Sequence, residues 1–154
     1  MVSGLRFPGW LPVIFVLILL QATAAQAQHV VCSKGMKARS CELLAEPVER
    51  QLKMLDAPGD WQWVVLDEKD WRQATGRFHV AEQSANAFTV LQLRITFLSE
   101  EYLQRNRPLP VLDVLAHELG HIRCVCGSER EARRLGAEML VAVYDGVKKS
   151  TARP

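Results

Sequence analysis

Two histidines four residues apart, His117 and His121, have a glutamate, Glu118, directly after the first, and together they form an HExxH pattern. In a helix of 3.6 residues per turn the two histidines lie about 40° apart, so both rings can reach one metal ion. Glu118 lies about 100° round the helix from His117, where it can act on a water bound to that metal. The pattern therefore predicts a zinc site built on one helix.

The residues before the motif favour a buried helix, because apolar side chains precede it at Val111, Leu112, Val114, Leu115 and Ala116. Burial would hold the two rings rigid. The alternative interpretation is a pair of core histidines without a metal. Two histidines and a glutamate on an apolar helix are difficult to satisfy in that way, since buried polar groups need partners.

The first 27 residues predict a secretory signal peptide. They contain one positive charge, Arg6, then an apolar run over 10–20, then small residues that end at Ala27. Cleavage after Ala27 would leave residues 28–154 as a single domain in the periplasm or outside the cell. An uncleaved membrane anchor is the alternative, but the run is shorter than the roughly 20 residues that span a bilayer. The mature chain is expected to contain no stable membrane span.

Charge gives little indication of a charged partner. The chain has 19 Lys and Arg against 17 Asp and Glu, and Arg6 belongs to the predicted signal peptide. A nearly neutral mature chain argues against binding to nucleic acid or to an anionic membrane surface.

The four cysteines, Cys32, Cys41, Cys124 and Cys126, predict two disulfides, since an even number is typical of small exported domains. A bond between Cys124 and Cys126 would close a very tight ring. The sequence therefore favours bonds from these two to Cys32 and Cys41, which would join the N-terminal segment to the end of the metal helix. A thiolate metal ligand is the alternative for Cys124, because it lies about 20° from His117 on the helix.

Hydrophobic periodicity predicts the remaining elements. They are, in chain order, a helix over 41–55 with Pro47 in its first turn, a strand over 61–66, a strand over 85–98, a short helix over 99–103, the metal helix ending at Gly127, and a helix from Ser128 to about Tyr144. The polar stretch 67–84 gives no clear element. This order predicts an α+β domain in which a short antiparallel or mixed sheet packs on the HExxH helix and a second C-terminal helix.

A zinc site of this kind takes a third protein ligand and keeps one position for water. No histidine follows His121, so the next helix is expected to supply a carboxylate, and it offers Glu129, Glu131 and Glu138. On a helical wheel Glu129 lies at the edge of the apolar face, whereas Glu131 and Glu138 lie on the solvent side. Glu129 is the predicted ligand, with a favourable interaction with the helix dipole as the alternative. Glu131 is interpreted as the capping-box partner of Ser128.

Three segments of the chain resemble gluzincin (HExxH) metallopeptidases of the HtpX type. They are Asn86-Ala-Phe88, the motif region 114–122, and the region 129–137 with the Tyr144-Asp pair after it. The resemblance covers residues 85–145 and implies a small zincin-like domain, similar to an exported minigluzincin. It implies that the strand from Asn86 borders the cleft and pairs with an extended substrate, for which an ordinary core strand is the alternative.

The resemblance also places Glu129 at the first position of the family's Glu-x-x-Ala-Asp pattern. Ala132 matches that pattern, but Arg133 stands where the family has its aspartate. Because the aspartate supports the metal site from outside the ligand set, this departure bears on metal affinity and activity. The gap between His121 and Glu129 is also shorter than is usual in the family.

The expected function is zinc-dependent hydrolysis of a peptide or protein substrate, with His117, His121 and Glu129 as ligands of one zinc ion and Glu118 as the base. Candidates for stabilising the oxyanion are Tyr102, Tyr144 and His79, by residue type alone. One rival is a non-catalytic exported module that keeps the fold and binds a partner protein, for which Arg133 is the main support. Another is a disulfide-stapled structural protein without a metal.

Overall fold

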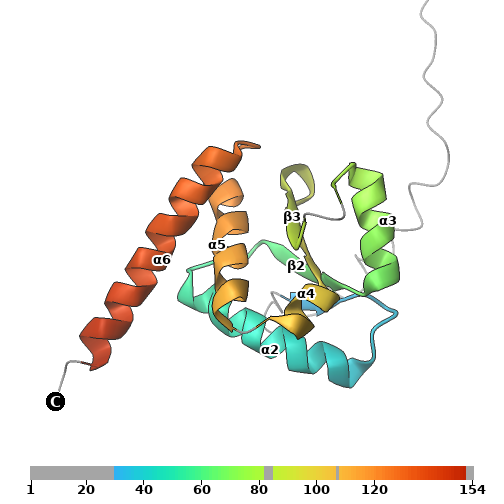
Figure 1. Ribbon diagram of the computed structural model, residues 1–154, viewed down its shortest axis with the longest axis horizontal. Coiled ribbons are helices and arrows are strands. Elements are labelled where there is room, and N and C mark those ends of the chain that lie inside the picture. Colours follow the sequence, from blue (N-terminus) through green and yellow to red (C-terminus); the bar gives the residue numbers. More distant parts are fainter. Residues whose placement is uncertain (1–29, 82–84, 107, 152–154) are drawn as a thin grey trace, which may run out of the picture.

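The computed structural model describes residues 30–81, 85–106 and 108–151 (Figure 1). The predicted signal peptide, residues 1–27, lies outside these ranges. Within them the elements are β1 (Val30–Cys32), α2 (Ala38–Met54), β2 (Gln62–Leu66), α3 (Glu68–Phe78), β3 (Ala87–Val90), the 3-10 turn η1 (Leu91–Leu93), β4 (Ile95–Ser99), α4 (Glu100–Arg105), α5 (Pro108–Cys124) and α6 (Glu129–Thr151). None of the described helices is long and apolar enough to cross a membrane.

The strands form one mixed sheet in the order β1-β2-β4-β3, which confirms the α+β class and the mixed sheet expected from the sequence. β1, β2 and β4 run parallel, and β3 pairs with β4 in the antiparallel direction. β3 is therefore an edge strand. Its register places Thr89 opposite Thr96, a pair that becomes important at the site.

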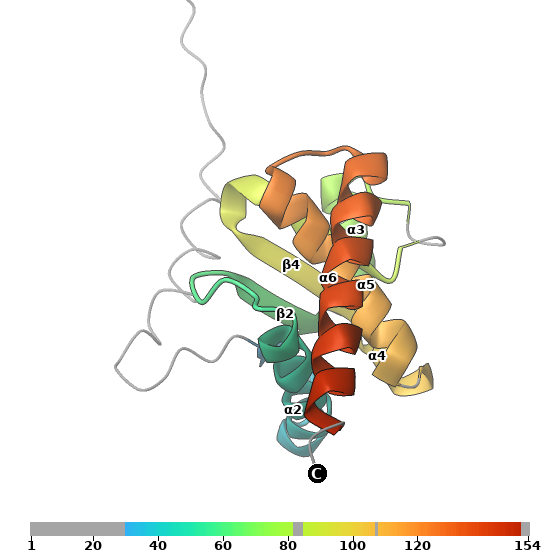
Figure 2. The same cartoon turned by 90° about the vertical axis from the view of Figure 1, so that its left-hand side faces the viewer.

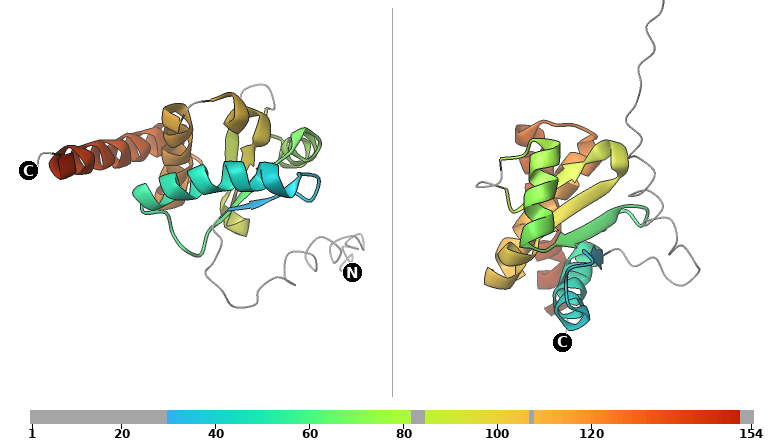
Figure 3. Two further views of the ribbon diagram at one scale, coloured as in Figure 1. Left: turned by 90° about the horizontal axis from the view of Figure 1, so that it is seen from below. Right: turned by 90° about the vertical axis from the view of Figure 1, so that its right-hand side faces the viewer.

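Helices cover both faces of the sheet, as parallel strands require. α2 and α5 pack on one face, where Trp63, Leu98 and Leu115 are fully or almost fully buried. α3 packs on the other face over an aromatic cluster that contains Trp71 and Phe88. α5 lies between the sheet and α6, as Figures 1 and 2 show. Figure 3 shows α2 running across the sheet and the C-terminal part of α6 projecting past the other elements.

The prediction of a single strand over 85–98 is wrong, because the segment is a hairpin of β3 and β4. The alternation of apolar residues continues through the turn η1, where Leu93 is 44% exposed. Arg94 has a left-handed conformation with φ of 55°, which ends η1 and reverses the chain. The hydrophobic pattern does not reveal this reversal, since polar and apolar residues keep alternating through the turn.

Two helices also differ from the expectation. α2 begins at Ala38, so Pro47 lies inside the helix and not in its first turn. Pro47 is exposed, and so is Leu43, whose carbonyl loses its helical partner to the proline and can bind water instead. α3 occupies the polar stretch that gave no clear element, and it begins where Asp67 accepts a 2.9 Å hydrogen bond from the Asp70 amide.

The disulfide pairing expected from the sequence is wrong. The structure pairs Cys32 with Cys41 and Cys124 with Cys126. Val125 has φ of 50°, and this left-handed residue folds the chain back so that the Cα atoms of Cys124 and Cys126 lie 5.1 Å apart. That separation is within the range of ordinary disulfides, which removes the objection to the tight ring. Since both cysteines are bonded, the alternative thiolate ligand at Cys124 is also excluded.

Candidate metal centre

The HExxH motif lies in the C-terminal half of α5, the helix that the sheet buries most deeply. Leu115, Ala116 and Leu119 are fully buried and fix the helix on the core. The two histidines lie on the side that faces α6, with 26% of the His117 side chain and 11% of the His121 side chain exposed. The rings are therefore held rigidly and remain accessible.

Two glycines allow α5 and α6 to approach closely. A Cβ atom on Gly120 would overlap the carbonyl oxygen of Ala132, and one on Gly136 would lie only 2.9 Å from the carbonyl oxygen of Ala116. Larger residues at either position would push the helices apart. The close crossing places the start of α6, and with it Glu129, against the histidines of α5. The sequence interpretation did not assign this role to the glycines, although both lie in segments that carry the family resemblance.

The structure brings the three predicted ligands together. The Oε2 atom of Glu129 lies 3.2 Å from His117 Nε2, and its Oε1 atom lies 3.3 Å from His121 Nε2. The imidazole rings are nearly perpendicular, with centroids 4.9 Å apart. One ligand atom from each residue can be chosen so that all three lie within 4.8 Å of one another. These three residues, which we call the metal group, can hold a metal ion.

The hydrogen bonds behind the ligands favour metal binding at His121. Its Nδ1 atom lies 2.9 Å from the carbonyl oxygen of Cys126, so Nδ1 carries the proton and donates it. The Nε2 lone pair then points at Glu129, as a metal ligand requires. The Cys124–Cys126 disulfide and the left-handed Val125 shape the loop that presents this carbonyl. No described residue forms a comparable hydrogen bond with His117 Nδ1.

Glu118 is buried, with 5% of the residue exposed, and a chain of hydrogen bonds reaches it from the sheet. Thr89 Oγ1 lies 2.6 Å from Glu118 Oε2, Thr96 Oγ1 lies 2.8 Å from Thr89 Oγ1, and Trp61 Nε1 lies 3.0 Å from Thr96 Oγ1. An indole N–H can only donate, and an ionised carboxylate can only accept. Each hydroxyl therefore donates toward Glu118, and these hydrogen bonds hold one carboxylate oxygen in place. Sequence reasoning missed this hydrogen-bond chain, because its residues are far apart in sequence and meet only through strand pairing.

Burial sets the protonation of the site. It raises the pKa of Glu118, and the hydrogen bond from Thr89 opposes this only in part. Burial also lowers the pKa of His117, helped by the charges of His121 and Arg133 and opposed by Glu129. A lowered pKa favours the neutral imidazole, which is the form that binds metals.

The candidates for oxyanion stabilisation do not converge on the metal group. The hydroxyl of Tyr102 donates to the carbonyl of Pro110. Tyr144 lies 15 residues beyond Glu129 on α6, about 22 Å along the helix. His79 ends α3, which covers the opposite face of the sheet from α5 (Figure 1).

Glu131 and Glu138 lie on the solvent side of α6, as the helical wheel predicts, and both contact Arg134. The Glu131 amide donates to Ser128 Oγ, which is half of the expected capping box, while the Glu131 carboxylate pairs with Arg134. These two carboxylates are therefore occupied elsewhere, which leaves Glu129 as the candidate acidic ligand among the three glutamates.

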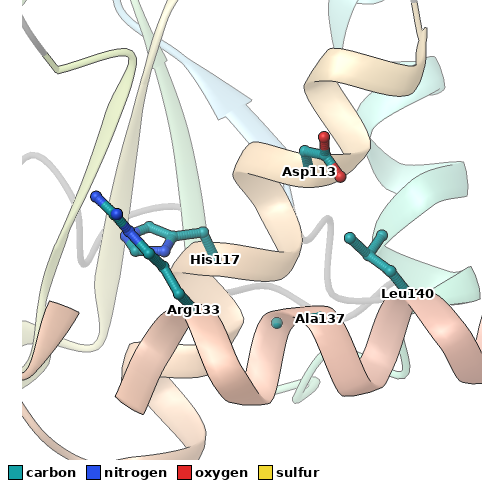
Figure 4. A pocket seen from close by; sticks show the side chains of 6 residues that line it. Asp113, His117, Arg133, Ala137 and Leu140 are labelled. Atoms are coloured by element: carbon teal, nitrogen blue, oxygen red, sulfur yellow. The ribbon is translucent and has the colours of Figure 1, made fainter. Parts of the chain in front are cut away.

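A pocket of about 180 Å³ lies between α5 and α6 beside His117. Its lining residues are Asp113, His117, Arg133, Gly136, Ala137 and Leu140. In Figure 4 the Arg133 guanidinium lies next to the His117 ring, and Asp113 and Leu140 lie farther along the helix pair. The sequence marked Arg133 as a departure from a family pattern, and the structure places it at the metal group.

Comparisons of the chain with models of protein families, with curated proteins and with solved structures find no match.

Proposed function

We propose that the protein is an exported, minimal zinc metallopeptidase of the gluzincin type that hydrolyses peptide bonds. The observation that carries the proposal is the meeting of His117, His121 and Glu129 beside the buried carboxylate of Glu118. Metal ligands alone would fit a structural site. A buried glutamate next to the first ligand, aligned by its own hydrogen bonds, has a further use as a general base.

Zinc fits the donor set. Two imidazole nitrogens and a carboxylate are ligands typical of catalytic zinc, which leaves its fourth position open. Ligand atoms about 2.1 Å from a tetrahedral ion lie about 3.4 Å from one another. Each Glu129 oxygen lies near this distance from a different histidine nitrogen, at 3.2 and 3.3 Å. With one ligand atom from each residue the three atoms lie within 4.8 Å of one another, so a small inward shift of the side chains would close them on one ion.

Bound zinc would lower the pKa of a water molecule and polarise the carbonyl of the scissile bond. The residues of the chain then have distinct tasks. Glu118 takes the proton of the attacking water and passes it to the leaving amine, which its raised pKa favours. Thr89 holds the Oε2 atom of Glu118, so that Oε1 is free for this transfer.

The edge strand β3 suits an extended substrate. One of its sides pairs with β4, and no described strand occupies the other. Thr89 of β3 contacts Glu118, so a peptide added to the open edge would run next to the base. Strand addition supplies backbone hydrogen bonds without demanding a particular side chain, which suits a protein or peptide substrate. Export follows from the predicted signal peptide and agrees with the two disulfides.

The first experiment is a metal analysis of the purified protein. We expect about one zinc per chain in the wild type and in Glu118→Gln, and little in Glu129→Ala. Zinc content unchanged by Glu129→Ala would refute the ligand assignment. The second experiment incubates wild type and Glu118→Gln with a broad peptide library. Cleavage by the wild type that the variant loses is the expected result.

A binding module is the second candidate, because Arg133 places a positive charge beside a site that should hold a cation. In that case zinc is bound, and wild type and Glu118→Gln leave every peptide intact. Capture of a partner protein would then depend on the open edge of β3 and not on Glu118.

A further inference from the structure

Arg133 is a cation at the metal group that has no ion-pair partner among the described residues. No described residue forms an ion pair or hydrogen bond with its guanidinium, although it lines the pocket beside His117 (Figure 4). Its neighbour Arg134 differs, since it binds both Glu131 and Glu138. Paired arginines on exposed helix faces are ordinary. An unpaired one next to metal ligands requires a reason.

The reason lies in the spacing of α6. Arg133 follows Glu129 by four residues, and a glutamate four residues before an arginine is its favoured helical partner. Here both Glu129 oxygens point at His117 and His121 instead. The positions one turn further on are Gly136 and Ala137, which offer no side-chain acceptor. Among the positions three or four residues away from Arg133 on the described part of α6, the metal group thus takes the one side-chain acceptor.

The surroundings of the guanidinium suit a carboxylate supplied from outside the chain. A planar guanidinium binds carboxylates with two parallel hydrogen bonds. The pocket beside it is about 180 Å³, enough for a small acidic group, and the one acid that lines it, Asp113, lies at its other end (Figure 4). The other nearby carboxylate, Glu129, is directed at the two histidines, so it leaves the guanidinium open to a ligand carboxylate.

We propose that Arg133 is a specificity-determining residue that binds a carboxylate of the substrate within about two residues of the bond that is cleaved. The distance follows from the helix, because side chains one turn apart are about 6 Å apart, and an extended peptide covers that in two residues. The carboxylate belongs either to the free C-terminus of a peptide or to an aspartate or glutamate side chain. This inference rests on the proposed peptidase function and names its substrate class.

The test measures binding, so it does not depend on turnover. Zinc-loaded Glu118→Gln protein is titrated calorimetrically with acetyl-trialanine, with its C-terminal amide, and with the amide of acetyl-Ala-Asp-Ala. The same titrations are made with Arg133→Ala and with Arg130→Ala added to that background. Arg130 is the matched control, since it is exposed on the same helix, carries the same charge and does not line the pocket.

We expect at least one of the two carboxylate peptides to bind about tenfold more tightly than the neutral amide. Arg133→Ala should remove this preference and leave binding of the amide unchanged, whereas Arg130→Ala should retain it. The peptide that shows the preference identifies the source of the carboxylate. Equal binding of all three peptides, or a preference that survives Arg133→Ala, overturns the inference.

Failure of the inference is distinct from failure of the proposed function. Zinc binding with Glu118-dependent cleavage of neutral peptides, and no carboxylate preference, leaves the peptidase intact and removes the role of Arg133. Absence of zinc from every variant overturns both. Zinc content and thermal unfolding of Arg133→Ala verify that the variant is folded before its affinities are compared.

Discussion

At the scale of single residues, the site combines groups that cost stability with groups that hold them in place. Glu118 is a carboxylate in a buried position, and its only described hydrogen-bond donor is Thr89. Burial of a charge is unfavourable unless it is paired. A residue that weakens the fold and still occupies the centre of the site is typical of function, since stability alone would select a neutral side chain.

Glu118→Gln should therefore stabilise the metal-free protein at neutral pH. The folded-state pKa of Glu118 lies above its unfolded value of 4.5 because of burial. Below pH 4.5 the Glu118 carboxyl is protonated in both states, and the wild type does not bear the cost of burying a charge. The wild type loses stability as pH rises from there through the folded-state pKa. Urea unfolding at about pH 4 and about pH 8 should show similar stability for the two proteins at acid pH and a more stable variant at alkaline pH. Glu42→Gln, at an exposed position of α2, should show no such divergence.

Arg133 sets the charge next to the metal group. Arg133→Asp replaces a positive charge beside His117 by a carboxylate. Hydrogen-bonded carboxylates behind metal-bound histidines typically change affinity by about 10- to 100-fold. We expect zinc to bind Arg133→Asp at least about tenfold more tightly in a competition assay with a chelating dye. Arg130→Asp should change the zinc affinity far less. Equal effects of the two variants would mean that the affinity responds to the net surface charge and not to the position of Arg133.

At the scale of elements, the site depends on how closely α5 and α6 cross. Gly120→Ala should destabilise the protein by about 1–3 kcal/mol, because the added methyl overlaps the carbonyl of Ala132. It should also weaken zinc binding, since separation of the helices withdraws Glu129 from the histidines. Gly146→Ala is the control on α6, where nothing lies within 4 Å of the added Cβ. Alanine there should stabilise the helix by about 0.5–1 kcal/mol and leave zinc affinity unchanged.

The loop between the two helices is the second element on which the metal group depends. Its Cys126 carbonyl accepts the hydrogen bond that orients His121. Replacing Cys124 and Cys126 by serine should weaken zinc binding by about tenfold, because the loop no longer holds that carbonyl and Val125 is free to leave its left-handed conformation. Replacing Cys32 and Cys41 by serine should lower the melting temperature without the same effect on zinc. An unchanged zinc affinity in the Cys124 and Cys126 variant would show that the helix alone orients His121.

At the scale of the whole molecule, the relative placement of side chains within one helix is predictable from the sequence, whereas chain reversals are not. The histidines and Glu129 follow from helical spacing, which fixes relative angles within one element and its apolar face. The hairpin at Arg94 and the Cys124–Cys126 ring at Val125 both rest on left-handed non-glycine residues, which leave no mark in a hydrophobic pattern. The hydrogen bonds that lead from Trp61 to Glu118 depend on the register of β3 and β4, which is a tertiary property. The crossing glycines acquire meaning only once two helices are known to touch.

A metal that joins α5 to α6 should also stabilise the whole molecule. Zinc at a free concentration about 100 times its dissociation constant adds about 2.7 kcal/mol to the folded state, provided that it does not bind the unfolded chain. The melting temperature should therefore rise with zinc, fall on addition of a chelator and lose both responses in Glu129→Ala. His79→Ala, which removes a histidine from the opposite side of the sheet, should keep both. A melting temperature that ignores zinc in the wild type would mean that the two helices are held by packing alone and that the Glu129–histidine contacts are ion pairs.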